Sequence, residues 1–433
     1  MITDDAWDAW QEQGTFNHEV IQRWMSAWNM KIKHQRHYAL LMLMRGVSCL
    51  LMKNRRFILT NTTKLDPRIG MIYFSDSGSG KGMGVAQYVG VFREVGLNIE
   101  SLKKPTPEKL IGSIDSTADT RNRQKGYSPT DEKYLNPIIP GYFEICDDII
   151  FDEAENSFNG QQYGDELLRN VRCALDNYGS PNNMMKSETL KNMVGHTYPC
   201  ACNVAFLSYH LDNVSKSILK NGIFQRPVSF FYHIGKPEMV DILTSPKQSI
   251  IKDIEKARLK TVADLKKVAH FIETMDSDIY ISDEAVKLAE KSSLYELGEI
   301  SKDEDIRSRM QSFLPRVKDN LFRCAAVLAV IKGRKIVNEA DVEEAQLIVL
   351  TLGYQSMKRE LVVYGALAKE QQQWYMDLKK NLHKNRYTKE IVNSIMGKVW
   401  GVSRMTAIAR LKKMADVFEV VKGKGNTKLV KLI

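Results

Sequence analysis

The sequence predicts an α/β protein with a mostly parallel sheet, followed by a helical unit and a small basic terminal module. Between residues 66 and 235, short apolar runs such as "IGMIYF" and "CNVAFLSYH" alternate with helical stretches. This alternation is typical of parallel strands covered by helices on both faces. From 236 to 368 the pattern is almost wholly helical, and the Asn338 side chain is expected to cap the helix that follows it. Residues 369–433 end with helix, helix and hairpin signals, and Ser403 is expected to cap the second of these helices.

The first 65 residues are expected to be helical. They contain four of the six tryptophans, and apolar residues recur at helical spacing through "VIQRWMSAWNMKI" and "YALLMLMRGVSCLL". We interpret this region as a helical cap on the domain that follows. A surface for a partner protein or for DNA is the alternative.

Length and composition indicate an ordinary globular protein of two or three domains, with 433 residues of which 43% are hydrophobic. The longest apolar run, Tyr38 to Met52, is interrupted by Arg45 and is too short to span a bilayer. No secretory signal opens the sequence. We therefore expect a cytoplasmic protein that does not enter a membrane.

The six cysteines are scattered, and the CxC pair Cys200 and Cys202 has no second Cys or His pair to complete a zinc site. Buried free thiols are expected.

The positive charge is concentrated at one end of the chain. Residues 371–433 carry fourteen Lys and Arg against four Asp and Glu, so this segment accounts for the whole net charge of +10. A neutral body with a basic terminal module indicates a protein that acts on a polyanion held partly by that module.

The stretch "IYFSDSGSGKGMG", residues 72–84, predicts a phosphate-binding loop between a strand and a helix. Glycines let the backbone approach phosphate closely, and Lys81 would reach the outer phosphates. A hydroxyl residue is expected after the lysine to hold magnesium, but this position is Gly82. The loop residues expected to bind nucleotide are Ser77, Gly78, Ser79, Gly80, Lys81 and Gly82.

Two adjacent carboxylates follow a second apolar strand in "DDIIFDEAE". Phosphoryl transfer needs one carboxylate to organise Mg²⁺ and another to orient the attacking water, and Asp152 and Glu153 suit these two roles. Acidic residues that cap a helix are the structural alternative. The order of the two motifs favours binding of ATP with Mg²⁺.

Two later positions extend the candidate site. "CNVAFLSYH" is another buried strand with a polar end, where Ser208 or His210 could sense the outer phosphate. Arg226 precedes a further strand and is a candidate arginine finger that reaches a neighbouring subunit's nucleotide. A capped strand end and a solvated arginine are the corresponding structural interpretations.

The terminal module has the element order of a winged helix-turn-helix. In the helix after Ser403, Met405 and Ile408 are spaced to face a core, while other residues fall on the opposite face. The residues expected to contact DNA phosphates are Thr406, Arg410 and Lys413 of this helix and Lys422 and Lys424 of the wing. A winged helix used for protein contact is the alternative.

The series "SDSGSGKG", "IIFDEAE", "NVAFLSYH", "GIFQRPV", a helical lid and a winged helix resembles AAA+ ATPases. It is most similar to the MCM-like replicative helicases of plasmids, viruses and mobile elements, over roughly residues 68–433. The resemblance implies that Arg316 is a sensor arginine of the lid, with Arg323 second, and that a pore hairpin carries Lys186 and Lys191 to DNA. The large N-terminal region of MCM proteins has no counterpart here.

The expected function is therefore an ATP-dependent DNA helicase or translocase that works as a ring, with a hexamer favoured. A primase or an initiator is a possible partner. Two alternatives stay open: a switch ATPase that loads a helicase or regulates transposition, and a DNA-binding scaffold whose nucleotide site is degenerate.

Overall fold

The computed structural model describes residues 16–28, 35–75, 80–103, 106–128, 130–133, 135, 138–154, 164–175, 200–208, 226–232, 248–300, 314–354, 374, 377–378, 387–388, 396–413, 418–422 and 428–432. Among these residues, no helix combines the length and apolar composition that a membrane crossing requires.

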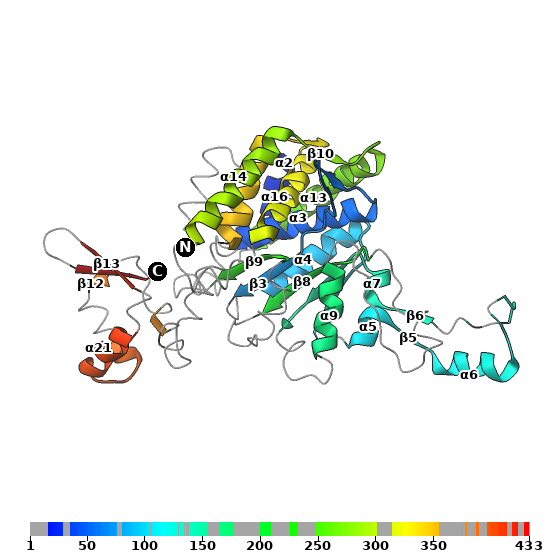
Figure 1. The fold of residues 1–433 in the computed structure, drawn as a ribbon, viewed down its shortest axis with the longest axis horizontal. Coiled ribbons are helices and arrows are strands. Elements are labelled where there is room, and N and C mark those ends of the chain that lie inside the picture. Colours follow the sequence, from blue (N-terminus) through cyan, green and yellow to red (C-terminus); the bar gives the residue numbers. More distant parts are fainter. Residues whose placement is uncertain are drawn as a thin grey trace.

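The core of the body is a five-stranded parallel sheet, as the sequence predicts (Figure 1). Its order is β4-β7-β8-β3-β9, and every neighbouring pair is parallel. The strands are β3 (Met71–Ser75), β4 (Ile99–Leu102), β7 (Asp148–Phe151), β8 (Asn203–Ser208) and β9 (Val228–Tyr232). All residues of β3 and β7 are buried, which explains their apolar composition, since helices cover both faces.

Helices α3 (Gln35–Lys53) and α4 (Lys81–Glu94) lie on one face of the sheet, and α9 (Gly164–Leu175) lies on the other (Figure 1). Short helices α5 (Pro107–Ile111) and α7 (Tyr142–Ile145) pack together near the edge strand β4. Nearly every side chain from Tyr38 to Met52 is buried, so α3 belongs to the core of the sheet domain.

A buried ion pair fixes α3 to the sheet. The Arg45 guanidinium pairs with Asp148 at the start of β7, and both side chains are fully buried. Arg45 Nη1 also donates to the carbonyl oxygens of Ile69 (3.0 Å) and Val204 (2.8 Å), while the Tyr88 hydroxyl donates to Asp148 Oδ2 at 2.6 Å. The carboxylate facing Arg45 raises the pKa of its guanidinium against the opposing effect of burial. Arg45 therefore ties together the amino ends of three strands.

The helical unit comprises α13 (Gln248–Thr274), α14 (Asp283–Ile300), α16 (Leu314–Ile331), α17 (Glu339–Gln346) and a π-helical turn, η2 (Leu347–Tyr354). The predicted cap is confirmed, because the Asn338 side chain accepts from the Asp341 N–H and Asp341 accepts from the Asn338 N–H.

Segments far apart in the chain share a second, small sheet. Its order is β11 (Ile336–Val337), β10 (Ile279–Ile281), β1 (Ile58–Leu59) and β2 (Lys64–Leu65). In addition, α2 (Glu19–Ala27) packs along α13. The N-terminal segment thus packs against the helical unit and shares a sheet with it.

A hairpin arm projects from the body between β4 and β7 (Figure 1). It consists of β5 (Gly112–Ile114) and β6 (Ile138–Pro140), which pair antiparallel, with α6 (Ser116–Lys125) beyond them. The Asn122 side chain donates to the Leu135 carbonyl oxygen at 2.6 Å and accepts from the Leu135 N–H at 3.0 Å. Sequence periodicity did not predict this arm.

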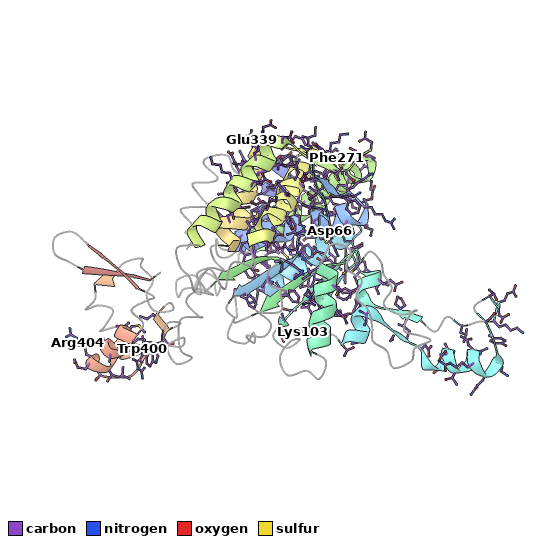
Figure 2. All side chains as sticks on the ribbon, in the orientation of Figure 1. Asp66, Lys103, Phe271, Glu339, Trp400 and Arg404 are labelled. Atoms are coloured by element: carbon purple, nitrogen blue, oxygen red, sulfur yellow. The ribbon has the colours of Figure 1, made fainter. Side chains whose placement is uncertain are left out.

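The terminal module contains α21 (Arg404–Lys413) and a three-stranded antiparallel sheet in the order β12 (Tyr387–Thr388), β14 (Lys428–Leu432), β13 (Phe418–Lys422). The predicted pairing of the last two strands is confirmed, with Val420 opposite Val430. The Ser403 cap is confirmed as well, since Ser403 Oγ accepts from the Thr406 N–H at 3.2 Å. Figure 2 labels Trp400 and Arg404 in this module.

Candidate functional site

The predicted phosphate loop lies where strand β3 leads into helix α4. Ser75 ends β3, and Gly80 precedes the helix in the left-handed conformation, with φ of +85°. Lys81 is the first residue of α4 and is 3% exposed. Its ammonium donates to the Ser75 carbonyl oxygen at 2.5 Å and to Ser75 Oγ at 3.0 Å. Ser77, Gly78 and Ser79 lie outside the described residues.

These contacts place the lysine charge at the carboxyl end of β3 and beside the amino end of a 14-residue helix. Both features favour an anion there, because helix N–H groups and the dipole present positive charge. Gly82 is exposed, and a Cβ added to it would meet nothing within 4 Å. The space beside the loop can therefore hold either a hydroxyl or a metal-bound water.

The two carboxylates come directly after β7 at the same edge of the sheet. The Asp152 N–H donates to the Leu102 carbonyl oxygen at 2.9 Å, which continues the pairing of β7 with β4. Phe151 pairs with Phe206, and Phe206 pairs with Ile72, so β7 ends at the level of Ile72, three residues before β3 ends at Ser75. One strand separates β7 from β3, which corresponds to about 10 Å between the two strands. A triphosphate with its metal ion spans such a gap.

Glu153 adopts an unusual backbone conformation. Its φ is +57°, in the left-handed region that residues other than glycine rarely occupy. Such residues cluster at sites where surrounding structure fixes a side chain for chemistry. The Glu153 carboxylate lies 3.4 Å from the ammonium of Lys103, the residue after β4.

Ser208 ends β8, directly opposite Phe74 of β3. This position lies between the phosphate loop and the two carboxylates, as expected for a residue that senses phosphate. The structure does not describe the Ser208 side chain, and His210 lies outside the described residues.

Sequence reasoning missed two residues at this edge. Lys103 was not predicted because a single lysine at a strand end carries no motif. The Tyr38 hydroxyl donates to the Lys81 carbonyl oxygen at 3.3 Å, and its ring stacks on Tyr73 at 4.5 Å. Burial above all, and then Tyr73 and Asp152, raise the pKa of Tyr38, so the hydroxyl remains a neutral donor.

Arg226 lies at the amino end of the parallel strands, opposite the predicted phosphate loop, and α16, the helix of Arg316, packs beside it. Val228 pairs with Met71 at the amino end of β3, so Arg226 is near the level of Ile69. Asn320 of α16 donates its side-chain N–H to the Arg226 carbonyl oxygen at 3.2 Å, and Arg316 lies one helical turn before Asn320.

Arg226 is at the level of Ile69, and the six residue steps from Ile69 to Ser75 correspond to about 20 Å. An arginine side chain does not cover that distance. Arg226 therefore does not reach the predicted phosphate loop of its own chain in this structure.

Arg323 is the more buried of the two arginines of α16. It is 6% exposed, and its Nε donates to the Asp66 carbonyl oxygen at 2.9 Å. Burial lowers the pKa of this guanidinium. Arg323 therefore anchors α16 to the segment that leads into β3.

The predicted DNA contacts are only partly described. Lys186, Lys191 and Lys424 lie outside the described residues, and Lys413 and Lys422 lie in α21 and β13 without described side chains. Thr406 is exposed at the start of α21.

Arg410 and Met405 are oriented differently from the predicted amphipathic helix. The Arg410 guanidinium lies over the rings of Trp374 (4.7 Å) and Trp400 (5.6 Å). The prediction that Met405 faces a core is wrong, since it is 74% exposed. Arg410 thus packs on the two tryptophans, and Met405 lies on the surface.

Comparison with known proteins does not assign the chain to a family. The sequence matches no protein family model, and no curated protein is significantly similar to it.

Proposed function

We propose that the protein is an ATP-dependent DNA helicase or translocase of the AAA+ type that works as a ring of identical subunits. One observation carries the nucleotide part of this proposal. Lys81, Asp152, Glu153 and Ser208 all stand at the carboxyl edge of one parallel sheet, within reach of a single triphosphate. Ligands of open α/β sheets bind at this edge.

The chemistry follows from the positions of the side chains. Lys81 would leave Ser75 to hold the outer phosphates, and Asp152 would hold a Mg²⁺ ion through its water shell, with a further water in place of the hydroxyl that Gly82 lacks. When bound, Mg²⁺ neutralises phosphate charge. Glu153 would orient and deprotonate the attacking water.

The position of Arg226 supports an assembly. Arg226 stands about 20 Å from the loop of its own chain, and Asn320 joins its segment to α16, the helix that carries Arg316. In a closed head-to-tail ring, this edge of one subunit would face the loop of the next, where arginines stabilise the transition-state charge. A hexamer is the proposed ring.

The basic segment 371–433 supports DNA as the substrate, because fourteen cations can neutralise several phosphates. Its helix, capped at Ser403, and its antiparallel sheet are compatible with a winged helix. Replication of a plasmid, virus or mobile element is the proposed setting, on the strength of the sequence resemblance.

The test is ATP hydrolysis by the purified protein with and without single-stranded DNA. We expect turnover that DNA stimulates, and loss of at least about 100-fold in Lys81→Ala and in Glu153→Gln. Lys53→Ala changes a half-exposed lysine elsewhere in the body and serves as the matched control. Wild-type turnover that equals that of Glu153→Gln would refute hydrolysis at this site.

Strand displacement separates the motor from the switch ATPase. A motor displaces a labelled strand from a forked duplex only with ATP, whereas a switch ATPase hydrolyses ATP and leaves the duplex intact. DNA binding without any turnover would instead favour the scaffold.

A further inference from the structure

Helix α13 presents one strongly basic face to solvent. Five exposed lysines form this lysine face: Lys252, Lys256, Lys260, Lys266 and Lys267. From Lys256 to His270 the exposed residues are four lysines, one histidine, one leucine and one alanine, without a carboxylate among them. The five lysines span about 22 Å along the helix axis. Because the chain outside residues 371–433 is neutral overall, this face is a local concentration of positive charge.

The carboxylates nearest the middle of the lysine face are engaged by arginines. Arg258 donates from Nε to Glu255 Oε2 at 3.0 Å and from Nη1 to Glu94 Oε1, at the end of α4, at 2.6 Å. Asp264 is buried and pairs with Arg23 of α2. These acidic groups therefore fix α13 to its neighbours, and most of the lysine charge stays available to a ligand.

The lysine face destabilises the helix that carries it. Lys252, Lys256 and Lys260 follow one another at intervals of four residues, and like charges at this spacing repel along a helix. Lys267 Nζ lies 3.3 Å from Asp264 Oδ1, yet the Lys267 side chain is 79% exposed, so this pair offsets little of the repulsion. A bound polyanion would remove the repulsion, which favours its binding.

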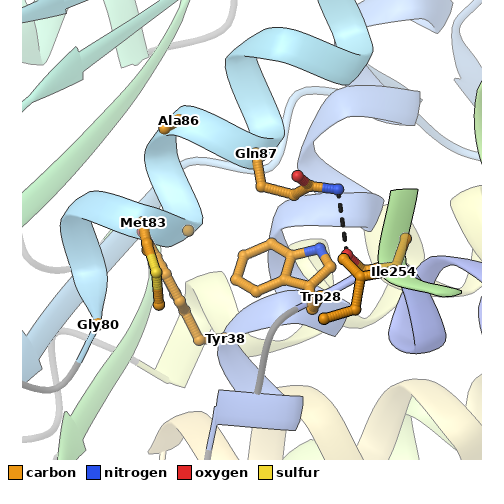
Figure 3. Close-up of a pocket in the computed structure, with 9 residues that line it drawn as sticks. Trp28, Tyr38, Gly80, Met83, Ala86, Gln87 and Ile254 are labelled. Carbon is orange, nitrogen blue, oxygen red and sulfur yellow. Dashed lines mark hydrogen bonds between the residues drawn. The ribbon is translucent and has the colours of Figure 1, made fainter. Parts of the chain in front are cut away.

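The opposite side of α13 is fixed to the body. Leu265 and Ile272 are fully buried, and the helix packs against α2, α3, α4 and α16. Ile254 lines a small cavity together with Trp28 and Met83 (Figure 3). The lysine face is therefore held in one orientation. A membrane surface takes up an amphipathic helix by its apolar side, and that side of α13 is already covered.

The composition of the lysine face favours the backbone of a duplex. Proteins that hold single strands combine a basic groove with aromatic rings on which the bases stack. The exposed residues from Lys256 to His270 include no tryptophan, tyrosine or phenylalanine. Lysine is a mobile point charge that neutralises phosphates without reading the bases. Because duplex DNA is stiff over this length, its phosphates form a regular array along which a straight helix can lie.

We propose that the lysine face of α13 binds the phosphate backbone of duplex DNA, as a second DNA contact besides the terminal module. This inference rests on the proposed function, which supplies DNA as the polyanion. It adds the form of the DNA and the surface of the body that holds it.

The experiment measures the affinity of the full chain for a labelled duplex of mixed sequence at several salt concentrations. Lys256→Gln with Lys260→Gln removes two cations of the lysine face. Lys287→Gln with Lys291→Gln removes two exposed lysines at the same spacing on α14 and is the matched control. We expect the slope of log K against log salt to become shallower by about 1.8 in the first double variant, with about 60-fold weaker binding at about 0.1 M salt, and to stay unchanged in the control.

Protection from acetylation locates the contact independently. Acetic anhydride modifies exposed lysines, and mass spectrometry measures the modification of each one in wild type. We expect the duplex to reduce modification of Lys256 and Lys260 several-fold and to leave Lys287 and Lys291 unchanged. A single strand of the same length should protect Lys256 and Lys260 less than the duplex does.

The possible failures are distinguishable. An unchanged salt slope without protection, or equal losses in the two double variants, would overturn the lysine face as a DNA contact while leaving DNA binding by the terminal module intact. Equal protection by the single strand would overturn the assignment to duplex DNA. Binding to anionic phospholipid vesicles that requires Lys256 and Lys260, without protection by the duplex, would assign the face to a membrane and overturn the inference. Absence of any DNA binding to wild type would overturn both this inference and DNA as the substrate in the proposed function.

Discussion

Gly82 is the position at which one substitution tests whether the proposed phosphate loop binds a metal ion. Gly82→Ser restores the hydroxyl that usually follows the lysine in loops of this kind. The structure accepts this change, since Gly82 is exposed and a Cβ would meet nothing within 4 Å. No packing cost therefore offsets the effect of the hydroxyl.

Two effects contribute, and they can be separated. Serine replaces glycine inside α4, which stabilises the helix by about 0.5 kcal/mol and raises the melting temperature by about 1–2 °C. A hydroxyl that ligates Mg²⁺ adds a charge-assisted contact of about 1.5–3 kcal/mol. The second effect corresponds to about 10- to 100-fold tighter binding of the magnesium nucleotide.

The control is Gly90→Ser, two helical turns further along α4. This glycine is also exposed, and a Cβ there also meets nothing within 4 Å. Gly90→Ser gains the same helix propensity but places its hydroxyl away from the loop.

The assay is the dissociation constant of ADP measured with Mg²⁺ and again with EDTA, together with the ATP turnover number. We expect Gly82→Ser to bind more tightly only when Mg²⁺ is present and to hydrolyse ATP faster, while Gly90→Ser matches wild type in both. Equal gains in the two variants, or a gain that persists in EDTA, would refute the idea that residue 82 faces the metal ion.

Three further predictions concern stability, the proposed catalytic carboxylate and the thiols. Arg45→Met leaves the buried Asp148 carboxylate unpaired and should lower the free energy of unfolding by about 3–5 kcal/mol in urea titrations. Lys53→Met removes the partner of Asp147, and it should lower the free energy of unfolding by under about 1 kcal/mol because Lys53 is half-exposed. Equal losses in the two variants would contradict the burial argument. Lys103→Met releases the Glu153 carboxylate and should lower the turnover number several-fold with little change in ATP affinity, and an unchanged turnover number would show that the pair does not position Glu153. In the native protein at pH 8, iodoacetamide should modify one cysteine at most, because five of the six are buried and burial raises the pKa of Cys146 and Cys324 to about 12; rapid modification of several cysteines, read by mass spectrometry, would contradict this.

Local signals explain what the sequence could predict. Apolar runs, the Asn338 and Ser403 caps and the terminal hairpin depend on residues within one turn or one strand of each other, and the structure contains all of them. Local patterns also predicted that Lys81 and the two carboxylates follow strands, and parallel pairing brings these strand ends to one edge of the sheet.

Long-range contacts explain what was missed. The strands of the small sheet have two or three residues each, so no periodicity marks them, and β10 lies far from both of its partners, β1 and β11, in the chain. The arm has a helix that is polar on every side, which resembles a loop in sequence. Arg410 packs on Trp374, a residue outside the helix whose periodicity suggested an exposed face.

The small sheet also restricts how this chain can fold during its synthesis. Ile58 pairs with Ile279, and Tyr280 pairs with Ile336, so strand β1 finds its parallel neighbour β10 only after residues more than 200 positions later have left the ribosome. Closing loops of that length costs entropy before any contact is gained, which slows folding. The apolar helix α3, which precedes β1, is therefore synthesised early, but α13 and α16, which pack on it, are synthesised late. Until translation passes residue 337, its apolar side chains need the growing sheet or a chaperone to shield them from other nascent chains.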